Sequence, residues 1–156
     1  MNETGRALTH LITQVLKPAG FKRVGDQWVI EGDDCVGAVN LQKSNYSNTY
    51  YINLAVAPRE LLPAQIPRTE EFTLYGRANA LPKCEMLKEL RFPEQSVIID
   101  DRTAVAISAC FNESIIPFIA SLLSRRGLRA FLDTDLSRHF TGCTPDKILA
   151  DLKSLP

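Results

Sequence analysis

Carboxamide side chains gather in one part of the chain, where two runs of residues have the composition of β-strands. The runs cover residues 36–42 and 49–57, and the linker between them holds no apolar aliphatic side chain but contains Asn and Ser, which favour turns. Because side chains alternate between the two faces of a strand, the amides and one tyrosine would share a face. These residues are Asn40, Gln42, Asn53 and Tyr51. An amide offers both a donor and an acceptor, so the cluster could bind a polar ligand or the backbone of a partner protein.

Two interpretations of this cluster stay open at the level of sequence. In one, another element covers the amides, and they stabilise the fold by hydrogen bonding to backbone, as buried polar groups usually do. In the other, they form an exposed binding surface, to which Lys43, Tyr46 and Tyr50 could add contacts, because tyrosine is enriched at interface anchors. The candidate partner-binding residues are Asn40, Gln42, Lys43, Tyr46, Tyr51 and Asn53.

A symmetric hairpin predicts a specific register between the two runs. Gln42 would pair with Thr49 and Asn40 with Tyr51, and the opposite face would then be wholly apolar. That apolar face consists of Val39, Leu41, Tyr50, Ile52, Leu54 and Val56. Apolar residues at helical spacing between residues 8 and 16 predict a helix that covers this face.

Short strands separated by turns are expected on both sides of the hairpin. They should cover residues 21–24, 27–31, 72–77 and 96–99, with a short helix over 83–90. The close spacing of the first turns favours an antiparallel meander, because parallel strands need longer crossovers.

Proline positions mark the irregular and helical parts of the remaining chain. Residues 58–68 contain three prolines and should form either a plain surface connection or a lid over one end of the sheet. From Asp101, a candidate helix cap, the chain turns helical, with a kink or break expected at Pro117 and a last helix starting at Thr144 and Pro145. The predicted fold class is α+β, in a single domain over residues 1–156: an N-terminal helix packed on an antiparallel β-meander, followed by C-terminal helices.

Other chemically capable residues have simpler structural interpretations. Asp100 and Asp101 could form an acid–base pair or bind a metal, but neighbouring carboxylates before a helix usually cap it. His139 and Cys143 are four residues apart, yet Gly142 weakens a helix there and no acidic orienting residue is evident. A modest basic spot, for an acidic partner or a solvated helix end, consists of Arg125, Arg126 and Arg129. The sequence contains no Gly-rich phosphate loop, nucleophile elbow or zinc-type spacing.

Composition argues against several classes of partner. The 156 residues include 18 basic and 18 acidic side chains, so no overall field attracts nucleic acid or an anionic membrane. The N-terminus lacks the pattern of a signal peptide, and no apolar run of about 18 residues is evident. The four cysteines are scattered, which fits buried thiols in a reducing cytoplasm. We therefore expect a cytoplasmic protein that binds neither nucleic acid nor membrane.

Three segments together resemble a bacterial family of unknown function, DUF4304. They are residues 16–23 running into Trp28, residues 39–44, and residues 50–54. In that family a helix that ends in a Gly-Phe element is likewise joined to a hairpin with an Asn-Leu-Gln-Lys-Ser-like strand. The resemblance implies no established activity, cofactor or catalytic residue.

We expect a non-enzymatic bacterial domain that binds another protein and uses no cofactor, metal or catalytic residue. Analogy with small bacterial domains suggests an immunity protein, which binds a toxin and neutralises it. The alternative is a small-ligand-binding domain, or an enzyme without a recognised motif, with a pocket lined by Trp28, Asn40, Tyr51 and Asn53. A concave pocket beside these residues would favour a ligand, whereas a flat or convex exposed patch would favour a protein.

Overall fold

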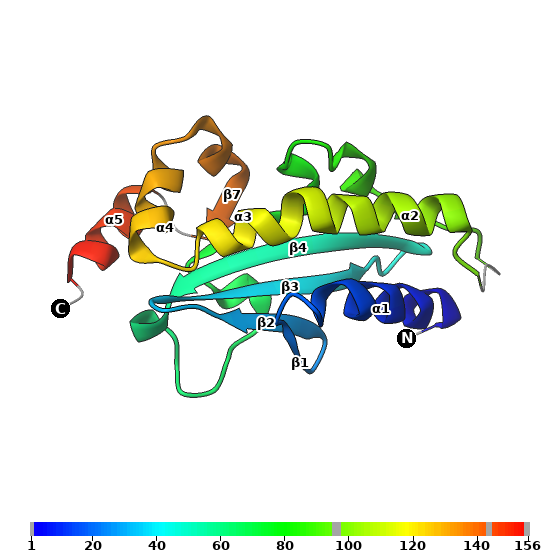
Figure 1. Ribbon diagram of the computed structural model, residues 1–156, viewed down its shortest axis with the longest axis horizontal. Coiled ribbons are helices and arrows are strands. Elements are labelled where there is room, and N and C mark those ends of the chain that lie inside the picture. Colours follow the sequence, from blue (N-terminus) through cyan, green and yellow to red (C-terminus); the bar gives the residue numbers. More distant parts are fainter. Residues whose placement is uncertain (1, 95–97, 143–144, 155–156) are drawn as a thin grey trace.

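Seven strands form one antiparallel sheet in the part of the chain that the structure describes (Figure 1). The structure is a computed structural model, and it describes residues 2–94, 98–142 and 145–154. Six strands follow the order β1-β2-β3-β4-β5-β7, and β6 pairs with the start of β4. An N-terminal helix, this sheet and C-terminal helices together confirm the predicted α+β class.

The strands are short except for the two of the central hairpin. Their bounds are β1 Lys22–Val24, β2 Gln27–Glu31, β3 Cys35–Lys43, β4 Thr49–Pro58, β5 Leu74–Arg77, β6 Leu90–Arg91 and β7 Phe140–Gly142. The helices are α1 Glu3–Leu16, α2 Asp101–Cys110, a π-helical segment Phe111–Ile115, α3 Ile116–Ser121, α4 Arg125–Leu132 and α5 Pro145–Ser154. Short 3₁₀ turns are Arg59–Leu61, Thr69–Glu71, Ala78–Ala80, Glu85–Lys88 and Asp135–His139.

Helix α1 packs on the apolar face of the sheet beside the long helix α2–α3 (Figure 1). The Asn2 side chain caps it by accepting a hydrogen bond from the Gly5 N–H at 3.0 Å. Its buried stripe is Leu8, Ile12 and Leu16, which belongs to the same core as the apolar side chains of β3 and β4. After α1 the chain turns at Gly20, whose φ of 94° favours glycine.

The predicted hairpin register is wrong by two residues, although the predicted faces are correct. Asn40 pairs with Asn53, and Gln42 pairs with Tyr51. The strands extend one pair further than expected, to Lys43, and a Ser44 N–H bond to the Thr49 carbonyl at 2.8 Å closes a five-residue loop. Because side chains alternate with period two, a shift of two residues keeps every side chain on its predicted face.

Several short elements differ from the sequence prediction. The expected helix over 83–90 is one 3₁₀ turn followed by β6, and Ile98 and Ile99 are not in a strand, while residues 96 and 97 lie outside the described ranges. Strand β7 was not predicted. It pairs with β5 at Gly76, where a Cβ would lie only 2.4 Å from the Phe140 ring, so this contact depends on the missing side chain.

The helix is not broken at Pro117, where the sequence predicts a kink or a break. Proline lacks an N–H and its ring would clash with the carbonyl of Glu113 in an α-helix. The π-helical segment, in which the Ile116 N–H bonds to the Phe111 carbonyl, widens the helix directly before the proline. A continuous helix of 21 residues, Asp101–Ser121, results.

This long helix is also apolar enough, by length and composition alone, to cross a membrane. Its most apolar window has a mean hydropathy of 1.5, a value that a core helix of a water-soluble protein also reaches. Here its inner side chains Ile107, Phe111, Ile115 and Ile119 are buried against the sheet and α1. The expectation that the chain does not interact with a membrane stays a prediction.

Replacement of Ile12 tests the packing of α1 on the sheet. Ile12→Ala should lower the free energy of unfolding by about 2–5 kcal/mol, because Ile12 is fully buried and its loss leaves a cavity. Urea unfolding measures the difference. The exposed Gln14→Ala on the same helix is the control and should change stability by less than about 0.5 kcal/mol. Equal effects of the two changes would contradict this packing.

Candidate binding site on the carboxamide face

The face of the sheet opposite the helices is divided into an apolar half and a polar half. The apolar half is a second, small core made of Val29, Val36, Ala38, Ala55, Ala57 and Phe72. The segment between β4 and β5 covers it with Leu62 and Ile66. Gln27 holds this segment in place, since it donates to the Pro67 carbonyl at 2.8 Å and accepts from Thr69 Oγ1 at 2.5 Å. The segment therefore covers only one half of the face.

The polar half is organised around Asn53, of which only 2% is exposed. Asn53 Nδ2 donates to Asn40 Oδ1 at 3.2 Å and to Gln42 Oε1 at 3.0 Å. Asn40 Nδ2 in turn donates to the backbone carbonyl of Asp26 at 3.3 Å. The amides that the sequence predicted to share a face thus form one hydrogen-bonded cluster, part buried and part accessible.

The carbonyl oxygen of the Asn53 amide has no hydrogen-bond partner within the described ranges. This oxygen, Oδ1, is buried and accepts no hydrogen bond from any residue that the structure describes. A buried polar group left unsatisfied costs about 1–3 kcal/mol, and most proteins pair such groups. A donor for this oxygen has to come from outside the described residues, as a water molecule or as a group of a ligand.

A hollow of about 370 Å³ adjoins the Asn53 side chain. Its lining residues are Asp26, Asn40, Leu41, Gln42, Lys43, Asn53, Glu70 and Tyr75. Two carboxylates, Asp26 and Glu70, face one ammonium group, Lys43, so the charge of the lining is negative. Burial raises the pKa of Tyr75, and Glu70 raises it further, so the phenol stays neutral. The hollow is rich in acceptors and suits a ligand group that donates.

Four of the six predicted partner-binding residues line this hollow: Asn40, Gln42, Lys43 and Asn53. Tyr51 shares the face but lies beneath Arg77, whose guanidinium carbon is 4.0 Å from the ring centroid. Tyr46 stands apart at the hairpin tip, where 97% of it is exposed.

The pocket proposed as the alternative does not form as predicted, because Trp28 lies on the other face of the sheet. Trp28 pairs with Val39 and belongs to the main core. Its indole N–H donates to Thr13 Oγ1 at 3.0 Å. Alternation along β2 therefore separates Trp28 from Asn40 and Asn53.

Sequence reasoning missed four residues of this region: Asp26, Glu70, Tyr75 and Arg77. Asp26 could have been found by pairing β2 with β3, because its neighbour Gln27 lies opposite Asn40. Glu70 and Tyr75 come from the covering segment and β5, and no local pattern in the sequence indicates that they meet the hairpin.

Most of this chain matches the model of one protein family. Residues 12–119 match the family model described as a domain of unknown function, DUF4304. The chain belongs to the DUF4304 family. No curated protein and no solved structure matches it. The matched range contains every residue that lines the hollow, so the hollow is built within the DUF4304 domain.

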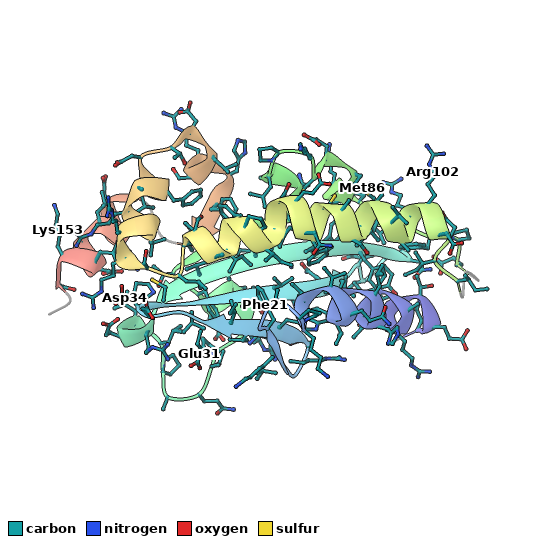
Figure 2. The ribbon with its side chains drawn as sticks, viewed as in Figure 1. Phe21, Glu31, Asp34, Met86, Arg102 and Lys153 are labelled. Carbon is teal, nitrogen blue, oxygen red and sulfur yellow. The ribbon has the colours of Figure 1, made fainter. Side chains whose placement is uncertain are left out.

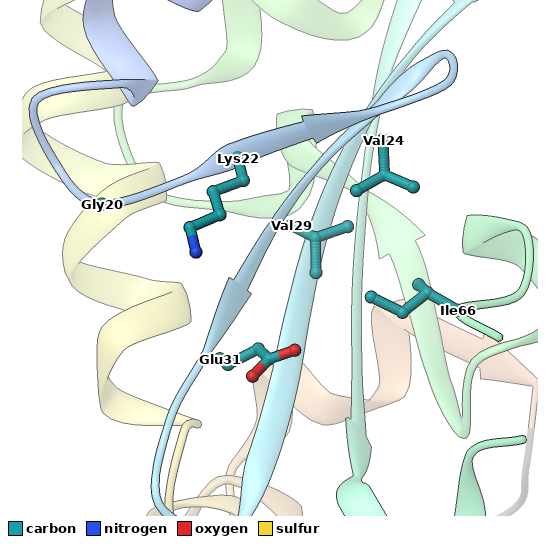
Figure 3. Close-up of a pocket in the computed structure, with 6 residues that line it drawn as sticks. All are labelled: Gly20, Lys22, Val24, Val29, Glu31 and Ile66. Atoms are coloured by element: carbon teal, nitrogen blue, oxygen red, sulfur yellow. The ribbon is translucent and has the colours of Figure 1, made fainter. Parts of the chain in front are cut away.

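A second, smaller hollow of about 240 Å³ lies beside β1 and β2 of the DUF4304 domain (Figure 3). Lys22 and Glu31 flank it, while Val24, Val29 and Ile66 form its apolar side. Glu31 already pairs with Arg59 at 3.2 Å. Unlike the hollow at Asn53, it contains no buried polar group without a partner among the described residues.

The remaining sequence candidates have structural roles or lie outside the description. Asp100, rather than Asp101, caps α2: its carboxylate accepts from the Thr103 N–H at 2.9 Å and the Thr103 hydroxyl at 2.7 Å, and both bonds lower the pKa of Asp100. His139 is exposed at the end of a 3₁₀ turn, and Cys143 lies outside the described residues. Arg125 forms an ion pair with Glu60. No group of three metal-ligating side chains occurs in residues 2–94, 98–142 and 145–154.

The described cysteines are buried thiols. Burial raises the pKa of Cys35 to about 11 and that of Cys84 to about 12, and it also raises the pKa of Cys110. A thiol with a pKa of about 11 is ionised in about one molecule per thousand at pH 8, so it reacts slowly.

Thiol labelling tests this arrangement. In a Cys143→Ser variant the three remaining thiols should react with an aromatic disulfide reagent at pH 8 at least about tenfold more slowly in the folded protein than in 6 M guanidinium. Release of the thiolate chromophore measures the rate. Fast labelling of the folded variant would show that one of these thiols is exposed.

A stability comparison tests whether Asn53 is kept for the fold. Asn53→Leu should change the free energy of unfolding by less than about 1 kcal/mol, because it removes an acceptor that has no donor. The two oxygens that lose their hydrogen bond from Asn53, Asn40 Oδ1 and Gln42 Oε1, belong to side chains that can reach water. Gln27→Leu, at an amide of the same face that is satisfied at both ends, should cost about 1–3 kcal/mol. Urea unfolding of both variants gives the comparison. A larger loss at Asn53 than at Gln27 would indicate a structural role.

Proposed function

We propose that this DUF4304 domain binds another protein through its carboxamide face, with a donor side chain of the partner inserted into the hollow at Asn53. The observation that carries the proposal is the buried Asn53 Oδ1 without a donor among the described residues. Binding a donor group would satisfy it and recover the free energy that the isolated chain loses there.

The charge of the hollow favours a cationic side chain of the partner. Asp26 and Glu70 outnumber Lys43 in the lining, and the guanidinium of arginine brings five N–H donors that suit carboxylate and amide oxygens together. Arginine is also enriched among the residues that dominate protein interfaces. We therefore infer that the inserted group is an arginine or, with fewer donors, a lysine.

The hairpin tip offers a second anchor for such a partner. Tyr46 is almost fully exposed in the loop that follows Lys43, which lines the hollow. Large exposed aromatic side chains are common interface anchors, since they bury much area for little loss of conformational entropy. Inhibition of a toxin is the specific form of binding that sequence analysis suggests, and it stays a prediction.

The concave shape of the hollow favours one second candidate, a small cationic ligand. Its volume of about 370 Å³ is at the low end of ligand sites, which usually range over about 300–1,000 Å³ and are lined mainly by apolar groups. The polar lining here fits one side chain better than a whole metabolite.

Site-directed photo-crosslinking in lysate of the source organism tests the proposal. A benzoylphenylalanine at position 46 should capture a protein, and Asn53→Leu should reduce the capture at least tenfold. Once the partner is identified, its dissociation constants for the unchanged protein and for Asn53→Leu give the loss of binding free energy directly. A tenfold difference corresponds to about 1.4 kcal/mol.

A probe at position 105 provides the control, because Val105 is 69% exposed on the helix side of the sheet. Capture at both positions, or capture that does not depend on Asn53, would contradict the proposal. A thermal-shift series with arginine, agmatine and spermidine separates the small-ligand candidate, since a ligand of the folded state raises its melting temperature.

A further inference from the structure

A row of cationic side chains lines a groove between α1 and the edge strand β1. Arg6 on α1 and Lys17, the C-cap residue that follows this helix, are eleven residues (about three turns) apart on one stripe, and Arg23 lies across from them on β1. Two adjoining hollows of about 300 and 530 Å³ share Thr13 and Arg23 as lining residues. Together they form one groove on the face of the sheet that carries α1.

The cations of this groove form no ion pair with the residues that the structure describes. Among the described residues, no carboxylate lines either hollow. Within the described ranges, the ion pairs that form involve none of Arg6, Lys17 and Arg23. In a chain whose net charge is zero, this is a local excess of positive charge that an anionic partner would complement.

The floor of the groove is apolar but offers no aromatic face for stacking. Phe21, labelled in Figure 2, and Trp28 are buried at 4% and 2% exposure. The Trp28 indole N–H donates to the Thr13 hydroxyl oxygen, and the Arg23 guanidinium lies 5.7 Å from the indole centroid. The aliphatic stems of lysine and arginine add apolar surface beneath their charges. Single-stranded nucleic acid, which needs exposed rings for its bases, is therefore disfavoured.

We propose that this groove binds an acidic, amphipathic segment of a protein partner in extended form. From Arg6 to Lys17 the helix rises about 16 Å, which matches about five residues of extended chain. Carboxylates of the segment pair with the cations, and its alternate apolar side chains contact the floor. The groove lies on the opposite face from the hollow at Asn53 and has the opposite charge, so it is a separate site for a different chemical group.

A defined peptide tests the groove. Fluorescence anisotropy of a labelled peptide with four Glu-Leu repeats should give saturable binding to the full chain that weakens at least tenfold for the double variant Lys17→Glu, Arg23→Glu. Both side chains are exposed, so the variant should keep its urea midpoint. Raising the salt concentration from 0.05 to 0.3 M should also weaken binding, because surface charges are screened.

Three controls make the result decisive. Lys153→Glu, at the opposite end of the molecule in Figure 2, should leave binding unchanged, as should Asn53→Leu, which tests the other site. A neutral peptide of four Gln-Leu repeats should not bind. No binding of the acidic peptide at 1 mM, no effect of the double variant, or tighter binding of a twelve-residue oligothymidylate than of the peptide would overturn the proposal without bearing on the carboxamide face.

Discussion

The pairing of β3 with β4 is the interaction on which the rest of the structure depends. Nine residue pairs hold these strands together, and the register decides that Leu41 and Ile52 face the helices while Asn40 and Asn53 face the other way. A slip by one residue would place amides under α1 and aliphatic side chains in water. Burial of the apolar face therefore stabilises the same register that assembles the carboxamide cluster.

Unequal covering of the second face turns that cluster into a candidate site. The segment between β4 and β5 packs on the apolar half and ends beside Gln27, whose amide it satisfies at both ends. Asn53 lies just beyond this cover: its NH₂ group donates two hydrogen bonds, but its carbonyl oxygen accepts none from the described part of the chain. Gln27 and Asn53, two buried amides on one face, thus differ in whether a described residue donates to the amide oxygen. That difference is the basis of the proposed protein-binding role.

The neutral composition of the chain hides two surfaces of opposite charge. Acceptors and carboxylates gather in the hollow at Asn53, whereas arginine and lysine side chains line the groove between α1 and β1. The charges of the two surfaces cancel in the net charge of the sequence, because net charge carries no information about where the charges lie. The absence of an overall field therefore does not exclude charged partners, and each surface would select a different one.

The sequence by itself determined the α+β class, α1, the central hairpin and the sorting of its side chains into two faces, because these follow from local periodicity and turn composition. It also indicated three residues of the hollow, Asn40, Gln42 and Asn53, since alternation alone places them on one face. Only the tertiary structure decided the register, which depends on how the loop closes, and the pairing of β7 with β5. It also decided which half of the second face is covered and that Asp26, Glu70 and Tyr75 meet the hairpin. These contacts join residues far apart in the chain, and their free energy comes from packing and long-range pairing that no local pattern of residues encodes.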